Sequence, residues 1–293
     1  MTNSAWDLWT VACKWLQLLA SAGIVGGSFG LLLAQRSGLS LDRQLRSYLQ
    51  VSALLGAVSV PVLLLLQIGG IEQSGFAGMF DLQMGGILLQ SQLGNALRVR
   101  ELAYVLVLVA AGVALPSSTC SVTRRWSGIV ALLSAASLLG TSFALTGHVS
   151  ELSPVARILL VLHVLAVFAW IGALYPLLMM SRAAEPGQVQ RSMRRFGVLA
   201  VAIVGILVVT GTCLATQLLP DPLTPWATSY GRILLLKLAG VGLLLLLAAT
   251  NKLALVPRLQ RPGLLRRLQV SITAEMVVAL AVLAVTAWLT TLT

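Results

Sequence analysis

Charged residues are scarce in this 293-residue chain: Asp, Glu, Lys and Arg together make up 10% of it, while hydrophobic residues make up 58%. Soluble domains carry about 25% charged residues, so this composition excludes an ordinary soluble domain and indicates a membrane protein. A membrane-crossing helix needs about 20 apolar residues, and a helix satisfies its own backbone polar groups within lipid. We therefore expect an all-α, polytopic membrane helical bundle of eight transmembrane helices, forming a single integral membrane domain over residues 1–293.

Acidic side chains are scarcer than basic ones, with 9 Asp and Glu against 20 Lys and Arg and a net charge of +11. No aromatic–basic interleaving accompanies this charge, so we expect no nucleic-acid partner. Lys and Arg instead collect in alternate loops between the apolar runs. The positive-inside rule then places the odd-numbered loops in the cytoplasm and both termini outside.

Cysteine is also rare, and Cys13, Cys120 and Cys213 lie far apart in the chain. Their spacing excludes a disulfide framework and a Cys-x-x-Cys metal pair, so we expect them to act as packing residues. The N-terminus lacks a cationic region and a cleavage site, which predicts that the first helix is retained. No Walker motif is present to couple ATP hydrolysis.

Long apolar runs are what the chain has in abundance. The third is interrupted by Arg98, Arg100 and Glu101, which a membrane helix tolerates when the polar stretch faces the bundle interior. The expected helices cover residues 9–34, 48–69, 87–115, 127–147, 154–180, 196–219, 229–250 and 270–292.

An internal repeat is indicated by two pairs of similar segments, "LQLLASAGIVGGSF" with "LHVLAVFAWIGALY" and "SQLGNALRVRELAYVLVLVAA" with "TSYGRILLLKLAGVGLLLLLAA". Because four helices separate the pairs, the two halves would run in the same direction, giving a parallel 4+4 repeat with halves near 1–125 and 126–293. The matched positions are Gly26 with Gly172, Gln17 with His163, and Arg100 with Lys237. Binding sites in such proteins tend to lie where the halves meet, so we expect the four polar residues of this set to face inward. Glu101 and Glu275 are the candidate acidic partners of Lys237.

The two histidines of the chain lie in one short stretch, "GHVSELSPVARILLVLH". An ionisable group inside a membrane is costly and usually functional, which favours His163 as a ligand. His148 ends the preceding helix at the outer mouth. His163 lies about nine residues below Pro154, or roughly 13 Å deeper, so the spacing favours two separate sites over one shared ion.

The outer loop "EQSGFAGMFDLQMGG" adds further candidate ligands on the same side. Thioethers suit Cu(I), and imidazole suits copper in either oxidation state. Glu72, Met79 and Met84 are therefore possible outer metal contacts, with the oxidation state of the copper ion undecided.

Four elements, "LTGHVS", "LHVLAVFAWIGAL", "TSYGRILLLKLAGVGLLLLLAATNKLALVPRL" and "SITAEMVVALAVLAVTAWLTT", resemble the copper resistance D family (CopD/PcoD) of bacterial inner-membrane proteins. The resemblance covers essentially the whole chain. It implies multi-pass insertion in the inner membrane with periplasmic termini, movement of copper from periplasm to cytoplasm, and a periplasmic copper-binding partner of the CopC type. Members often carry a histidine in the first helix, where this chain has Gln17, a poor copper ligand. The family's recurrent polar positions fall on His148, His163, Trp170, Tyr230, Lys237, Asn251 and Glu275.

The expected function is therefore a non-enzymatic copper-handling protein, with His163 as the intramembrane ligand and His148 as the first ligand at the outer mouth. Lys237 and Glu275 would form a charge pair or gate. Two alternatives remain open: a haem- or quinol-binding electron-transfer protein, and a docking partner for a periplasmic copper chaperone that transports nothing. The sequence does not predict the oligomeric state.

Overall fold

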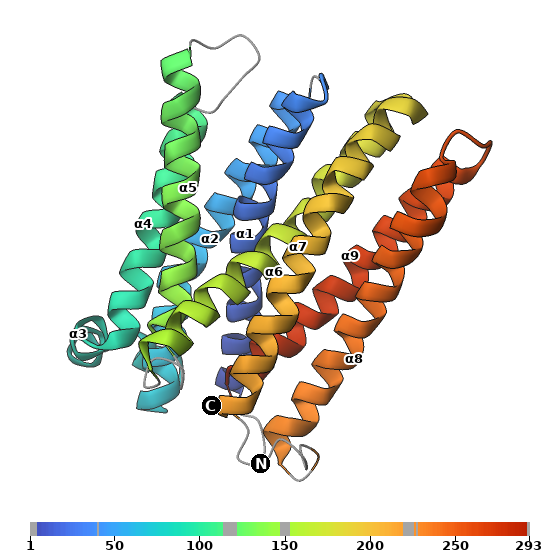
Figure 1. Ribbon diagram of the computed structural model, residues 1–293. Helices are drawn as coiled ribbons and strands as arrows, with labels where there is room; N and C mark the ends of the chain where they lie inside the picture. Colours follow the sequence, from blue (N-terminus) through green and yellow to red (C-terminus); the bar gives the residue numbers. More distant parts are fainter. Residues whose placement is uncertain are drawn as a thin grey trace.

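The computed structural model describes residues 5–39, 41–113, 122–146, 153–218, 226 and 228–291, and every regular element among them is helical. The long helices run roughly parallel or antiparallel in one bundle, with both ends of the chain at its lower end (Figure 1). Short η elements join them at Gly75–Phe80 (η1), Asn251–Leu255 (η4) and Val256–Arg258 (η5). The α-helices are α1 (Ala5–Arg36), α2 (Asp42–Glu72), α3 (Leu82–Gln90), α4 (Gln92–Val113), α5 (Val122–Ala144), α6 (Pro154–Ala183), α7 (Pro186–Leu218), α8 (Ser229–Thr250) and α9 (Leu264–Leu289).

Seven of these helices are long and apolar enough to cross a membrane: α1, α2, α5, α6, α7, α8 with its continuation to Arg258, and α9. The expectation of an all-helical, multi-pass membrane protein is confirmed at this level. The helix α4 is not among the seven, because Arg98, Arg100 and Glu101 lower its apolar character.

The single helix expected over residues 87–115 is wrong, because the chain breaks at Ser91 into α3 and α4. The carboxylate of Asp81 caps the start of α3 by accepting a hydrogen bond from the Met84 backbone N–H at 2.7 Å. Ser91 takes an extended conformation after Gln90, and its hydroxyl accepts from the Gly94 N–H at 3.4 Å. Side-chain caps of this kind satisfy the N–H groups that open a helix. The sequence therefore starts a new helix at a point where the apolar pattern continues.

Helices α1 and α6 cross at the centre of the molecule with no side chain between them. A Cβ atom placed on Gly172 would lie 1.7 Å from the carbonyl oxygen of Ala22, and one on Gly26 would lie 2.1 Å from the carbonyl carbon of Gly172. One turn further along, a Cβ on Gly30 would lie 2.4 Å from the Cβ of Pro176. Small residues let helix backbones approach closely in a membrane, and only glycine fits at this crossing.

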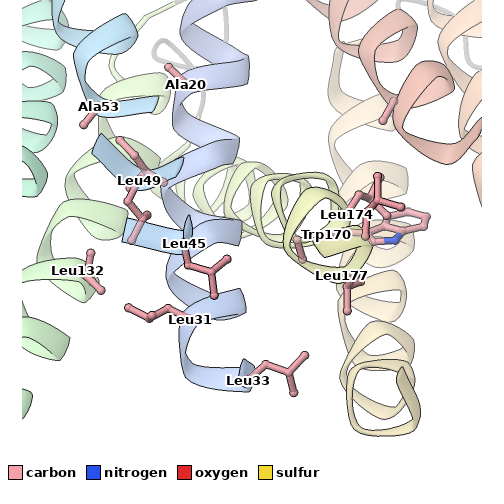
Figure 2. Packing of buried hydrophobic residues seen from close by; sticks show 14 of the residues in the cluster. Ala20, Leu31, Leu33, Leu45, Leu49, Ala53, Leu132, Trp170, Leu174 and Leu177 are labelled. Carbon is pink, nitrogen blue, oxygen red and sulfur yellow. The ribbon is translucent and has the colours of Figure 1, made fainter. Parts of the chain in front are cut away.

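The apolar core lies around this crossing. Leu45 and Leu49 of α2 are fully buried against α1. Figure 2 shows Trp170, Leu174 and Leu177 projecting from the other side of α6, towards the second half of the chain. These three side chains are also buried, and they form one wall of a cavity described below.

The helices pack more closely against one another in the first half of the bundle than in the second. In the first half α2 packs along α4, whereas in the described part of the second half α7 and α8 barely touch. Helix α8 packs mainly on α9, and α7 mainly on α6. Large apolar side chains such as Val198, Val209 and Leu246 are therefore more than 60% exposed, as expected of surfaces that face lipid.

Candidate functional site

A buried polar cluster joins α1, α4 and α5 in the first half of the bundle. The Arg100 side chain is only 5% exposed. Its Nη1 donates to Oε1 of Gln17, its Nε donates to Oγ of Ser142 at 3.2 Å, and its guanidinium carbon lies 4.0 Å from the centre of the Phe143 ring. A cation inside hydrocarbon requires such partners. Arg100 is therefore held by an amide, a hydroxyl and an aromatic face.

The same cluster extends to α2 through Gln17. Nε2 of Gln17 and Sγ of Cys13 both donate to the carbonyl oxygen of Ser59, at 3.1 and 3.2 Å. The hydroxyl of Tyr104 lies 2.9 Å from Oγ of Ser21 and donates to the Gln17 carbonyl at 3.3 Å. Gln17 and Ser21 are fully buried. With both ends of its amide bonded, Gln17 has a structural role in this cluster.

His163 of α6 faces α7, where it lies against Thr210 and Gly211. Its Nδ1 lies 3.0 Å from Oγ1 of Thr210, and that hydroxyl gives its single proton to the Ile206 carbonyl at 2.6 Å. A threonine hydroxyl carries one proton, so Nδ1 of His163 is the protonated nitrogen and donates to Thr210. A neutral imidazole protonated on Nδ1 carries its lone pair on Nε2, the form in which histidine binds metals. The Leu207 backbone also forms a hydrogen bond with this ring.

Lys237 of α8 lies close enough to His163 to act on it electrostatically. Its side chain is half-buried, and within the described residues its ammonium makes no hydrogen bond and no ion pair. The charge pair expected between Lys237 and Glu275 is not formed in that part of the chain.

Glu275 of α9 instead accepts a hydrogen bond from Nδ2 of Asn251. Both side chains are buried, with 4% of Glu275 and 8% of Asn251 exposed. The other amide atom, Oδ1 of Asn251, is buried and has no partner among the described residues. Asn251 begins the π-helical turn η4 that continues α8, and such turns occur often at functional sites.

A cavity of about 350 Å³ opens beside this pair, between α6, α7, the η4 turn and α9. Its wall is mostly apolar and includes the Trp170 ring and the thioether side chain of Met193. Lys252 also borders it, but its Nζ donates to the Gly197 carbonyl at 3.0 Å. Glu275 is the acidic residue that lines this cavity, whereas Oδ1 of Asn251 is buried away from its open space.

The outer-loop candidates lie apart from these clusters, at the end of the bundle that holds the chain termini. Met79 packs against Trp6 and Gly69, and the side chains of Met84 and Glu72 are half-buried. His148 lies outside the described residues. Tyr230 is half-buried in the first turn of α8. Among the described residues, no group of three His, Cys, Asp or Glu side chains comes together as a metal site.

Glu101 lines, together with Arg98, a shallow cavity of about 310 Å³. Its Oε2 is buried without a partner in the described structure. The structure therefore brings Arg100 and Gln17 together but leaves Glu101 outside their cluster.

Several residues of these clusters carry no sequence signal of their own. Ser142, Phe143 and Thr210 look like ordinary residues of membrane helices, and only the assembled helices bring them to Arg100 and His163. Met193 is likewise not distinguished by the sequence from the other methionines of the chain. Its position in the cavity with Glu275 emerges from the packing of α7 against α6 and η4.

This arrangement defines a class of protein: a multi-pass helical membrane protein with polar and ionisable groups buried in its interior. Residues 4–155 match the family described as copper resistance protein D-like, N-terminal domain, and residues 190–289 match copper resistance protein D. The chain therefore belongs to the copper resistance protein D family, which confirms the resemblance noted in its sequence. Neither a curated protein nor a solved structure matches it.

Proposed function

We propose that the protein carries copper ions across the bacterial inner membrane, from periplasm towards cytoplasm, without ATP hydrolysis. The observation that carries the proposal is the environment of His163. Its hydrogen bond to Thr210 favours the tautomer with the lone pair on Nε2, and an imidazole nitrogen suits copper in either oxidation state. In the described part of the bundle, Lys237 beside it has no hydrogen-bond partner to neutralise its charge.

The route begins at the end of the bundle where the chain termini lie, which we assign to the periplasm. His148, Met79, Met84 and Glu72 would supply outer contacts there. We also propose that a periplasmic copper-binding protein of the CopC type delivers the ion to this end. The basic loops at the opposite end support this orientation through the positive-inside rule.

The helix α4 would be the eighth span. Its 22 residues extend about 33 Å, which is enough to cross a hydrocarbon core of about 30 Å. Arg100 points into the bundle and is bonded on both sides, so its charge does not face lipid. An even number of spans agrees with both termini lying at one end (Figure 1).

Gene duplication accounts for the arrangement of the halves. The sequence matches Gly26 with Gly172, and these two glycines contact each other at the α1–α6 crossing. Gly30 and Pro176, at the same offset, also meet there. Contacts between equivalent residues are expected where two parallel repeats meet at a two-fold axis. This supports a parallel 4+4 repeat.

Copper uptake into proteoliposomes tests the function. The wild-type protein is expected to accumulate copper along a concentration gradient, and His163→Ala should reduce the rate at least tenfold because the intramembrane ligand is lost. His163→Met, which restores a copper ligand, should recover part of the rate. Normal uptake by a folded His163→Ala protein would contradict the role of His163.

Two alternatives give different readouts in the same preparation. A haem protein would show a Soret band, whereas a copper carrier is expected to be colourless. A protein that only docks a copper chaperone would retain its association when His163 is replaced, and wild-type proteoliposomes would accumulate no copper.

A further inference from the structure

The cavity beside Asn251 and Glu275 is a candidate for a second copper-binding site. We propose that this cavity binds Cu(I) after it leaves His163, with the Met193 thioether and the Glu275 carboxylate as ligands. The inference rests on the proposed function, because that function names the ion.

The Glu275 carboxylate indicates that the ligand of the cavity is positively charged. Nδ2 of Asn251 donates a hydrogen bond to Glu275, and Oδ1 of the same amide is buried without a partner in the described structure. Glu275 adds a carboxylate that is 4% exposed and whose one described partner is that amide. A buried carboxylate is costly unless a donor or cation compensates it. The cavity therefore fits a positively charged ligand.

The chemical class follows from Met193. Its side chain is 6% exposed and borders the same cavity. Thioether sulfur selects soft ions such as Cu(I) over alkali and alkaline-earth cations, which prefer oxygen ligands alone. Trp170 also lines the cavity and adds an aromatic ring of the kind that attracts cations.

The size and position of the cavity suit an ion leaving the membrane. At about 350 Å³ it has room for roughly ten waters. An ion can therefore regain part of its hydration there. Met193 lies two turns into α7 and Asn251 near the end of α8, close to the upper end of the bundle where the α6–α7 and α8–α9 loops lie (Figure 1). These are the basic loops assigned to the cytoplasm.

The π-helical turn explains how Asn251 and Glu275 meet. A π turn holds an extra residue, which breaks the regular hydrogen-bond ladder and redirects the side chains around it. Asn251 is the first residue of this turn, and it is bonded to the helix opposite. The turn thus builds a polar site into a helix that is otherwise apolar.

Protection of Met193 in the wild-type protein tests the site without any substitution. Ag(I), a soft monovalent ion that replaces Cu(I) without redox cycling, is added to the purified full-length protein before mild peroxide treatment. Mass spectrometry then measures oxidation of each methionine. Bound Ag(I) should slow oxidation of Met193 at least fivefold and leave Met276, the neighbour of Glu275 outside the cavity wall, unchanged. Equal oxidation of Met193 with and without Ag(I) would overturn the proposal.

Equilibrium binding provides the second measurement. Under anaerobic chelator-buffered conditions, the wild type is expected to bind one more Cu(I) equivalent than Met193→Leu, and Glu275→Gln should weaken that equivalent at least tenfold. Met276→Leu is the matched control and should bind as the wild type does. Unchanged Cu(I) binding by Met193→Leu or Glu275→Gln would exclude a copper-binding site in this cavity. Loss of copper uptake by the wild type itself would instead contradict the proposed function, so the two failures are distinguishable.

Discussion

Arg100 donates a hydrogen bond to Gln17 across the interface between α4 and α1. The residues matched to them in the second half, Lys237 and His163, lie near each other without a hydrogen bond between them in the described structure. Gln17 and Arg100 are bonded to each other and to further side chains of the cluster, whereas His163 is bonded to Thr210 and to the Leu207 backbone. The matched residues of the two segments therefore have different hydrogen-bond partners.

Replacing Arg100 by Leu should destabilise the protein by about 2 kcal/mol, because Gln17 and Ser142 lose a charged hydrogen-bond partner inside the membrane. Thermal unfolding in a fixed detergent measures the change. The control Arg98→Leu removes an exposed charge from the same helix and should leave the midpoint nearly unchanged. Equal effects of the two substitutions would contradict a stabilising role for the cluster.

Replacing Gly172 by Val should prevent correct packing of α1 against α6, because even a Cβ atom would lie 1.7 Å from the Ala22 carbonyl oxygen. The expected result is loss of monodisperse protein in size-exclusion chromatography. Gly242→Ala is the control, since a Cβ there meets no atom within 4 Å. A folded Gly172→Val protein would show that α1 and α6 can separate.

Replacing Thr210 by Val removes the hydroxyl that fixes the His163 tautomer while keeping the side-chain volume. Copper uptake should fall about three- to tenfold, because Nδ1 loses its acceptor and the ring is no longer oriented. Thr210→Ser should restore the rate. The control Thr273→Val lies on an exposed part of α9 and should have no effect. Failure of serine to rescue would argue for a packing role of Thr210.

Replacing Lys237 by Gln should tighten binding of Ag(I) at His163 about five- to tenfold, because a nearby positive charge no longer opposes the bound cation. Competition with a chelator of known affinity measures this change. Lys237→Arg retains the charge and should bind as the wild type does. Weaker binding by Lys237→Gln would indicate that Lys237 supports the ion rather than repelling it.

The proposed orientation predicts which cysteines a membrane-impermeant maleimide reaches in spheroplasts. In a background without the native cysteines, Ser74→Cys at the end that holds the termini should react at once. Gln260→Cys, in the loop between α8 and α9, should react only after the membrane is permeabilised. Both positions are exposed, so access to the label depends on the side of the membrane. The opposite pattern would reverse the direction assigned to transport.

Composition and apolar periodicity predicted the helical membrane fold because the bilayer imposes strong rules on length and polarity. The break at Ser91 was missed because its signal is a pair of side-chain caps at Asp81 and Ser91, not a change in hydropathy. The π-helical turn at Asn251 was missed for a related reason: the apolar pattern continues through it.

The sequence singled out Gln17, His163, Arg100 and Lys237 as polar residues of the interior. The structure bonds Arg100 to Gln17, whereas Glu275, the carboxylate expected beside Lys237, is bonded to Asn251. The bond between Asn251 and Glu275 lies between helices separated by a sharp turn, and its geometry depends on the π turn. Contacts that depend on local irregularity of this kind leave no pattern in a single sequence.

The separation between α7 and α8 has a consequence for the environment of the protein. Because these helices barely touch in the described structure and expose apolar side chains, acyl chains of the surrounding lipid complete the wall that protein provides in the first half. Little packing opposes movement of α8 relative to α7, so membrane thickness and acyl-chain order would act directly on the spacing of these two helices. The activity of the protein would then depend on the composition of the bilayer as well as on its own residues.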